Sequence, residues 1–151
     1  MAGTTSAPAQ VAEELYALMT VVLHSVPRDL SLTALSTLAG VERTGPRRIT
    51  DLAQSEGVTQ PSMTTLVSNL ERAGYLERRR EQSDGRVALV AITMAGSALL
   101  AQRRHAGAEA LDRLIDQLDE DQASALRAAA PAIAGLRGLD EVRRDTLAVR
   151  D

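Results

Sequence analysis

The sequence predicts a mainly α-helical protein with one small β-hairpin. Residues 50–93 contain two consecutive helix starts, a glycine that ends the second helix, and two short arginine-flanked strands joined through Asp84-Gly85. Hydrophobic residues make up 44% of the chain but aromatic residues only 1%, so Leu, Val, Ile, Ala and Met must fill the core. The order helix, turn, helix, hairpin is that of a winged helix-turn-helix, and amphipathic helices on both sides of it indicate an additional α-helical dimerisation region.

The composition excludes several classes of function. A chain of 151 residues is long enough for one folded unit with a substantial core, and the absence of cysteine excludes disulfides, thiolate metal ligands and thiol redox switches. Residues Met1 to Ala7 lack the basic start and apolar stretch of a secretory signal. The longest uncharged apolar stretch, Ala128 to Leu136, is too short to span a bilayer. We therefore expect a cytoplasmic protein without a membrane partner.

The charges are distributed unevenly along the chain. The net charge is -3, yet residues 31–104 hold ten arginines and only seven acids. This basic excess coincides with the helix-turn-helix and hairpin region, where a nucleic-acid partner would need it. All 17 cations are arginine, and arginine suits phosphates and guanine edges. A GC-rich genome would produce the same arginine bias, and we favour that simpler explanation for it.

The first part of the chain predicts two helices and a short strand. Apolar residues recur at steps of three and four from about Pro8 to Val26, which is typical of an amphipathic helix. Pro27 falls in the break before a second helix from about Leu32 to Val41. Gly45-Pro46 then marks a turn, after which residues 47–49 are a candidate short strand.

Two short helices follow. Thr50 is the predicted N-cap of the first, with Asp51 in its first turn, and Gly57 ends it. Thr59 caps the second, and Pro61 lies in its first turn, where a missing N–H costs nothing.

The second of these helices has one apolar and one polar face. Its buried face is predicted from the spacing of Met63, Leu66, Val67 and Leu70. The polar side chains between Gln60 and Arg72 are mostly short, so they could approach base edges or phosphates closely. Taken alone, this helix is more simply explained as a solvated surface helix.

The hairpin favours the DNA-reading interpretation. Gly74 ends the helix, and a strand from Leu76 to Arg80 carries three arginines. Arg86 follows two residues after Asp84, a spacing at which the acid can orient the guanidinium for a narrow minor groove. The alternative for an arginine in a hairpin is a solubilising charge, which we would prefer if the preceding helix were absent.

The last part of the chain predicts two more helices. Thr93 caps a long helix to about Leu118, and Asp119 with Gln122 resembles the capping box of a final helix. Pro131 should kink that helix. Beyond residue 138 the sequence allows either a further turn or two of helix or a frayed end.

The flanking helices need a partner for their apolar stripes. We divide the intertwined unit into an N-terminal dimerisation helix (residues 1–30), a DNA-binding region (31–95) and C-terminal dimerisation helices (96–151). A second copy of the chain is the economical partner, and a two-fold dimer presents its recognition helices to successive major grooves of an inverted repeat. The alternative is a monomer in which these helices cover one another.

The combined pattern resembles the MarR (multiple antibiotic resistance regulator) family of bacterial winged-helix repressors. The resemblance covers nearly the whole chain and rests on TQPSMTTLVSNLERAGYLERR, the recognition helix with its ending, and SDGRVALVAITMAG, the wing and the next helix start. It implies an obligate homodimer, major-groove reading by the helix from Thr59 to Arg72, and minor-groove insertion of Arg86 held by Asp84. It also implies repression, often relieved by a small phenolic or carboxylate ligand bound between the dimer helices and the DNA-binding lobe.

Two positions depart from the family pattern. Gly85 stands where many members have another arginine, and Thr65 stands where many have a long basic side chain. Phosphate anchoring is then weaker or shifts to other arginines, of which Arg47, Arg48, Arg78 and Arg79 are the candidates. The complete set of residues that we expect to contact DNA is Thr59, Gln60, Pro61, Ser62, Thr64, Thr65, Ser68, Asn69, Arg72, Arg78, Arg79, Asp84 and Arg86.

Competing functions have less support. The only histidines are His24 and His105, and no glycine-rich phosphate loop or H-E-x-x-H pattern is present, so we expect neither an enzyme nor a metal or cofactor. A winged helix used only for protein contacts is the main alternative. If a small aromatic or anionic effector binds, the candidate residues that would contact it are Tyr16, His24 and Arg103 (or Arg104). Ordinary packing or a solvated charge explains each of these residues more simply.

The hairpin assignment gives a mutational prediction. Arg86→Ala should leave fold and assembly intact, because a charge at a hairpin tip is expected to be exposed, yet weaken operator binding by about 1 to 3 kcal/mol. Titration of operator DNA at fixed salt measures this difference. An unchanged affinity would show that Arg86 does not enter the minor groove.

Overall fold

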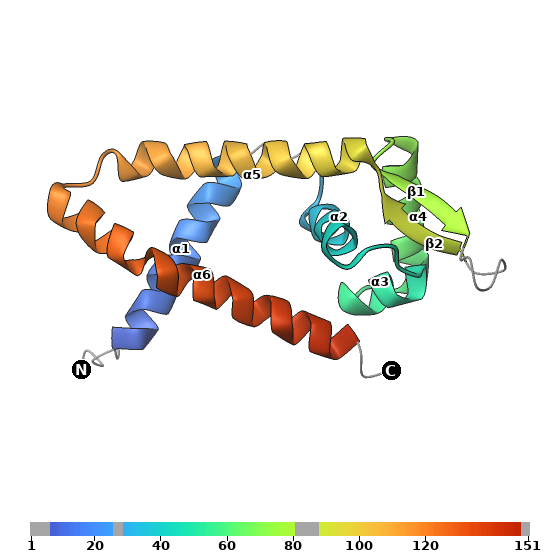
Figure 1. The fold of residues 1–151 in the computed structure, drawn as a ribbon, viewed down its shortest axis with the longest axis horizontal. Helices are drawn as coiled ribbons and strands as arrows, with labels where there is room; N and C mark the ends of the chain where they lie inside the picture. Colours follow the sequence, from blue (N-terminus) through green and yellow to red (C-terminus); the bar gives the residue numbers. More distant parts are fainter. Residues whose placement is uncertain (1–6, 26–28, 81–87, 149–151) are drawn as a thin grey trace.

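The structure, a computed structural model, describes residues 7–25, 29–80 and 88–148 (Figure 1). Within these ranges it contains six helices and one antiparallel hairpin, which confirms the predicted fold class. The elements are α1 (Ala7–Ser25), α2 (Leu32–Thr44), α3 (Ile49–Ser55), α4 (Gln60–Arg72), β1 (Leu76–Arg80), β2 (Ala88–Ile92), α5 (Met94–Ile115) and α6 (Glu120–Ala148).

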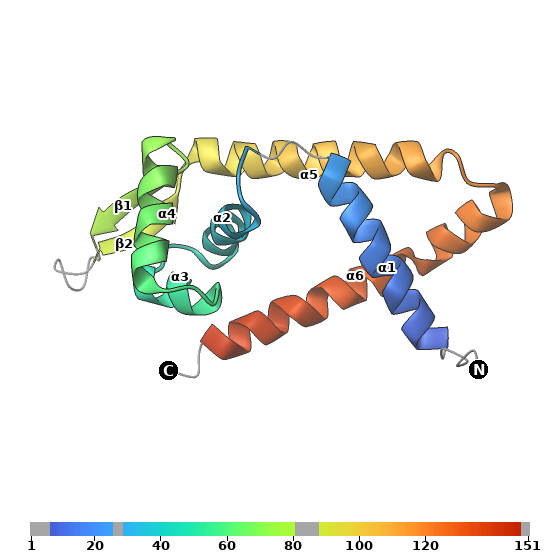
Figure 2. The same cartoon turned by 180° about the vertical axis from the view of Figure 1, so that it is seen from behind.

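Helix α5 runs along the length of the molecule and connects its two parts (Figures 1 and 2). The lobe formed by α2, α3, α4 and the hairpin lies at the start of α5, and α1 packs against α5 farther along. After a turn, α6 runs back toward the lobe, where it contacts α3. Helix α5 is therefore the element that connects the lobe to the two terminal helices, α1 and α6.

The core lies inside the lobe. It joins side chains of α2, α3, α4, both strands and the first half of α5, and Leu38, Met63 and Val67 have no exposed surface. The apolar face predicted for the helix after Thr59 is buried, with Leu66 only half-buried at its edge. Burial of this face orients α4, so that its polar face must point outward.

Helix ends follow the predicted capping chemistry at several positions. Thr59 is the N-cap of α4 and accepts from the Ser62 amide at 3.4 Å. At α6, the Gln122 amide donates to Asp119 Oδ1 at 2.8 Å, and the Gln122 side chain accepts from the Asp119 amide at 3.3 Å. This reciprocal pair is the capping box expected from the sequence.

The predicted N-cap of α3 is wrong. The helix begins at Ile49 and its N-cap is Arg48, which makes no side-chain capping bond, whereas the Thr50 hydroxyl donates to Asp51 Oδ1 at 3.1 Å. The reason is the strand pairing immediately before it. Arg47 exchanges two backbone hydrogen bonds with Val90, at 3.0 and 2.7 Å, which keep the chain extended up to the start of the helix.

The sheet is correspondingly small. Strands β1 and β2 pair from Leu76 opposite Ile92 to Arg80 opposite Ala88. On the other side of β2, the candidate strand at residues 47–49 is reduced to the single pairing of Arg47 with Val90. β2 thus lies between β1 and Arg47.

Some helix boundaries differ from the expected ones. Helix α2 extends to Thr44, and α5 ends at Ile115, three residues before the predicted end. Helix α6 runs without interruption through Pro131 to Ala148 and changes direction along its length (Figures 1 and 2). A proline removes one helical hydrogen bond and crowds the preceding turn, which bends a helix without necessarily ending it.

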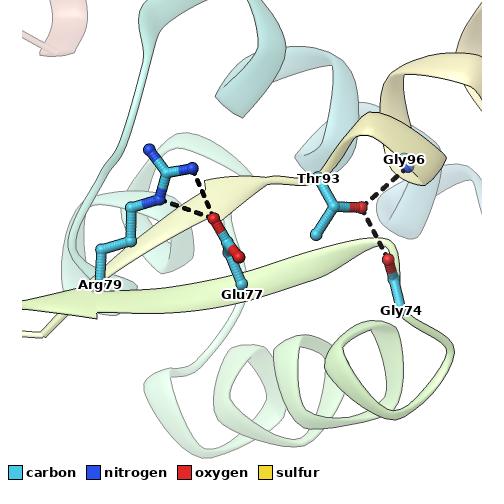
Figure 3. A network of polar contacts seen from close by, with 5 residues as sticks. All are labelled: Gly74, Glu77, Arg79, Thr93 and Gly96. Carbon is cyan, nitrogen blue, oxygen red and sulfur yellow. Dashed lines mark hydrogen bonds and ion pairs between the residues drawn. The ribbon is translucent and has the colours of Figure 1, made fainter.

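The end of α4, both strands and the start of α5 meet at one corner (Figure 3). The Thr93 hydroxyl donates to the Gly74 carbonyl at 2.6 Å and accepts from the Gly96 amide at 3.1 Å. Gly74 has φ +79°, the left-handed conformation that ends the helix. A Cβ on Gly96 would overlap the Tyr75 carbonyl oxygen and lie 2.7 Å from Ile92 Cγ1, so only glycine allows this approach of α5 to the turn.

This close approach predicts a costly substitution. Gly96→Ala should destabilise the fold by about 3 kcal/mol or more, because the new methyl group meets a backbone atom that has little freedom to move. Gly40→Ala in α2 is the matched control, since nothing lies within 4 Å of the position that its methyl group would take and alanine favours helix by about 0.5 to 1 kcal/mol. Urea unfolding followed by circular dichroism measures both changes, and equal stabilities would contradict the packing described for the corner.

Candidate nucleic-acid interface

The polar face of α4 is presented to solvent. Eight of the nine predicted contact residues at its start and along the helix are exposed, and only Ser68 is half-buried. The exposed residues are Thr59, Gln60, Pro61, Ser62, Thr64, Thr65, Asn69 and Arg72. The helix therefore offers one continuous surface of mostly short side chains on the side opposite the core.

Two threonines of this face are oriented by their own helix. The Thr64 hydroxyl donates to the Gln60 carbonyl at 2.8 Å, and the Thr65 hydroxyl donates to the Pro61 carbonyl at 3.1 Å. Because each hydroxyl proton is used within the helix, each side chain offers an acceptor oxygen and a methyl group to a partner. These groups suit exocyclic amines and the thymine methyl group of the major groove.

Asn69 and Arg72 form a unit at the end of the same face. The Arg72 guanidinium donates to Asn69 Oδ1, three residues earlier. This bond directs the Asn69 amide nitrogen outward as a donor, while the carbonyl oxygen keeps a second lone pair. An oriented amide with one donor and one acceptor matches the edge of adenine.

The arginines of β1 point to opposite faces of the strand. Arg78 lies on the face of buried Leu76, and its Nε donates to both carboxylate oxygens of Glu71 on α4, at 3.0 and 3.1 Å. Arg79 lies on the other face, where its Nε donates to Glu77 at 2.6 Å (Figure 3). The structure thus brings Arg78, but not Arg79, to the side of the strand that meets α4.

Arg47 is a further cation of the sheet. Arg78 and Arg47 both pair with Val90, from opposite sides, so the three side chains share a face. Two strand spacings separate the two arginines by roughly 10 Å. The sequence predicts both residues as phosphate anchors but cannot place them in one row.

Two predicted contact residues lie outside the described residues. Asp84 and Arg86 belong to the segment between β1 and β2, of which the structure describes nothing. Their assignment to the minor groove therefore remains a prediction from the sequence.

The predicted effector residues do not form one site in the described contacts. Tyr16 is 70% exposed on α1, and His24 Nδ1 donates to the carbonyl of Thr20 at 2.7 Å on the same helix. The Arg103 side chain is only 11% exposed and forms an ion pair with Asp29, just before α2. Arg103 thus holds α5 to the beginning of the lobe, which sequence reasoning missed because Asp29 lies 74 positions away along the chain.

The adjacent arginine makes a second connection of this kind. Arg104 donates to Glu42 of α2 at 2.9 Å. With Arg103, it links α5 to the lobe at two successive positions. The sequence offered these two arginines as candidate effector contacts and did not indicate their pairing with Asp29 and Glu42.

Two other kinds of site are absent from the part of the chain that the structure describes. Its residues contain no group of three or more histidine or acidic side chains placed to hold a metal ion. No described helix has the length and apolar character required to cross a membrane.

Comparison with known proteins gives a consistent family. Residues 30–88 match the MarR family. An uncharacterized HTH-type transcriptional regulator of Mycobacterium leprae is 34% identical over 107 residues, which cover 71% of this chain and 75% of the relative.

Solved structures show the same fold at lower identity. A transcriptional regulator from Thermotoga maritima is 21% identical and superimposes with a TM-score of 0.73 over 88% of this chain and 95% of its own. A variant of S. aureus MepR bound to an oligodeoxyribonucleotide is 20% identical, with a TM-score of 0.62 over 83% and 91% of the two chains. MepR bound to ethidium bromide is also similar, with 18% identity and a TM-score of 0.57 over 87% and 96%.

The hairpin, the capped helix α4 and the sequence matches agree with one another. The chain belongs to the MarR family of DNA-binding transcriptional regulators.

Proposed function

We propose that this protein is a homodimeric repressor that binds an inverted-repeat operator in double-stranded DNA. The observation that carries the proposal is the exposed polar face of α4, held outward by burial of Met63, Val67 and Leu70 on the opposite face and placed beside an arginine-bearing strand. A helix is the element that fits the major groove, and the polar face is mostly short side chains that can reach base edges. In this arrangement α4 reads bases, and Arg78 of β1 and Arg47 contact phosphates.

A second copy of the chain is the proposed partner of the terminal helices. The large apolar side chains exposed on α1 and α6 are Val11, Tyr16, Leu18, Met19, Val21, Leu23, Ile133, Leu136 and Leu139. In a self-contained monomer these helices would cover one another, yet Tyr16 is 70% exposed and Leu136 is 55% exposed. Helices of residues 1–30 and 96–151 that clasp those of a second chain would bury these side chains and create two-fold symmetry.

Dimer symmetry sets the form of the operator. Two α4 helices related by a two-fold axis enter successive major grooves when they lie about 34 Å apart, one turn of the duplex. The operator is then an inverted repeat with half-sites about 10 base pairs apart. Arg86, supported by Asp84, is proposed to enter the flanking minor groove on each side.

Release by a small ligand is the regulatory part of the proposal. It is supported by family membership and by the likeness to MepR, for which a complex with ethidium bromide is known. The exposed aromatic ring of Tyr16 and the imidazole of His24 are the candidate contacts for an aromatic or anionic effector. Arg103 is a weaker candidate, because an anion would have to compete with Asp29 for it.

Selection of bound fragments from genomic DNA tests the proposal. We expect enrichment of one inverted repeat, and the affinity for it should fall linearly with salt on a double logarithmic scale, since phosphate contacts release counterions. If the winged helix served only for protein contacts, no DNA sequence would be enriched. Any residual association with duplexes would then lack this salt dependence. That result would contradict the proposed function.

Asn69→Ala should relax discrimination at one base pair in each half-site. For the operator with the preferred base at that position, we expect the binding free energy to weaken by about 1 to 3 kcal/mol. For operators with the other three bases we expect little change, because a base contact and not a phosphate contact is removed. Competition binding with all four bases at each operator position measures this. Gln102→Ala, which removes an exposed amide from α5, is the control. A uniform loss of affinity for every duplex would instead place Asn69 at a phosphate.

Met19→Glu should dissociate the dimer. Met19 is 51% exposed within one chain, and its burial against a second copy would place a carboxylate in an apolar contact twice per dimer. The lost apolar burial alone, about 1.5 to 3 kcal/mol per side chain, raises the dissociation constant by roughly tenfold or more at each of the two positions. Thr20→Glu, on the polar side of α1, is the control. Light scattering after size exclusion measures the mass, and two variants of equal mass would contradict this interface.

A further inference from the structure

One ion pair connects the recognition helix to the hairpin. Arg78 Nε on β1 donates to both carboxylate oxygens of Glu71, at 3.1 and 3.0 Å, and the side chains are 42% and 24% exposed. Glu71 lies in the last turn of α4, seven residues before Arg78, so the pair spans the corner between the two elements.

The corner itself is fixed by backbone bonds. The Gly74 amide donates to the Glu71 carbonyl and the Tyr75 amide donates to the Leu70 carbonyl, each at 2.9 Å, and Leu76 is buried in the core. Beyond Leu76, residues 77–80 of β1 are exposed, and their backbone pairs with β2. Arg78 lies two residues, or roughly 7 Å, farther out along the strand. A contact at that distance resists rotation of the hairpin about the corner more effectively than one at the corner itself.

The neighbouring ion pair provides an internal comparison. Arg79 and Glu77 are also an arginine and a carboxylate on β1, but both belong to the same strand (Figure 3). The alternation of side chains along a strand puts them on the face opposite Arg78. Their pair cannot fix the strand relative to α4. The two pairs therefore have the same chemistry and different geometry.

We propose that Glu71 is a positioning residue for DNA recognition, which acts through Arg78 to hold the hairpin at a fixed angle to α4. This inference rests on the proposed function, because the angle matters only if helix and hairpin engage one duplex together. A fixed angle reduces the conformational freedom that binding must remove, and so favours the sequence at which both elements fit.

The inference predicts a change in operator affinity on removal of Glu71 that is opposite to the change expected from charge alone. Removal of an acid near DNA should strengthen binding to every duplex, because repulsion of phosphates is lost. If Glu71 merely neutralised Arg78, its removal would free that arginine and strengthen binding further. Positioning predicts the opposite for the operator and no loss for unrelated DNA.

The experiment compares full-length Glu71→Ala with Glu77→Ala as the matched control. We expect Glu71→Ala to weaken operator binding roughly two- to fivefold, the range for one partly exposed ion pair, with unchanged or tighter binding to a scrambled duplex of equal length. Glu77→Ala should leave the ratio of the two affinities unchanged. Tighter binding of both duplexes by Glu71→Ala would overturn the inference. An equal fall in the ratio of operator affinity to scrambled-duplex affinity in the two variants would overturn it too.

A charge exchange separates positioning by the pair from the phosphate contact proposed for Arg78. The double variant Glu71→Arg/Arg78→Glu restores an ion pair between α4 and β1, and we expect it to regain most of the operator preference lost in Glu71→Ala. Because Arg78 is also a proposed phosphate contact, the exchange should lower the affinity for operator and scrambled duplex alike. A preference that stays lost would show that the positioning role is wrong.

Hydrogen exchange provides a readout that needs no DNA. We expect faster amide exchange across β1 and β2 in free Glu71→Ala but not in Glu77→Ala, since only the former releases the hairpin from α4. If Glu71→Ala changes neither the amide exchange of the hairpin nor the affinity ratio, the inference is refuted. The proposed function still stands in that case, provided that the wild-type protein prefers the operator. A wild-type protein that prefers no duplex would refute the proposed function instead.

Discussion

The geometry of this protein depends on the approach of α5 to the turn after α4. At that point the Thr93 hydroxyl bonds the Gly74 carbonyl and the Gly96 amide, and the absence of a side chain at Gly96 lets the helix start lie against Tyr75. The end of α4, the base of the hairpin and the start of α5 thereby share one fixed corner. Any orientation that α5 imposes on the lobe reaches α4 and the hairpin, the elements proposed to read DNA, through this corner.

Packing and surface chemistry are divided between the faces of a few elements. On α4, fully buried Met63 and Val67 fix the helix in the core. The polar face is not packed in the core and makes bonds within its own helix, such as that from Thr64 to Gln60. On β1, Leu76 enters the core and the arginines that follow alternate between faces. Because the apolar contacts carry the stability, the exposed side chains can be selected for recognition with little cost to the fold.

Features determined by neighbouring residues could be predicted from the sequence. The cap at Thr59, the capping box of Asp119 and Gln122, the left-handed Gly74 and the buried face of α4 each depend on a few adjacent positions, and the structure has all of them. The start of α3 could not be predicted in this way. It depends on the pairing of Arg47 with Val90, 43 positions away, which outweighs the capping preference of Thr50.

The partners of the charged side chains were also beyond reach from sequence alone. The basic excess of residues 31–104 indicated an interface. Whether Arg78 faces α4 depends on Glu71, and whether Arg103 is available to a ligand depends on Asp29, and only the folded chain brings these acids near the arginines. Asp84 and Arg86 show the reverse case, since their assignment comes entirely from the sequence and the resemblance.

The central claim is that α4 and the hairpin, held at this corner, engage one duplex as a symmetric pair. Hydroxyl-radical footprinting of the selected operator tests it most directly, because the cleavage pattern records which grooves are covered on each strand. We predict protected patches related by two-fold symmetry on one side of the duplex, centred about 10 base pairs apart. A single patch, or uniform protection along the fragment, would contradict the claim.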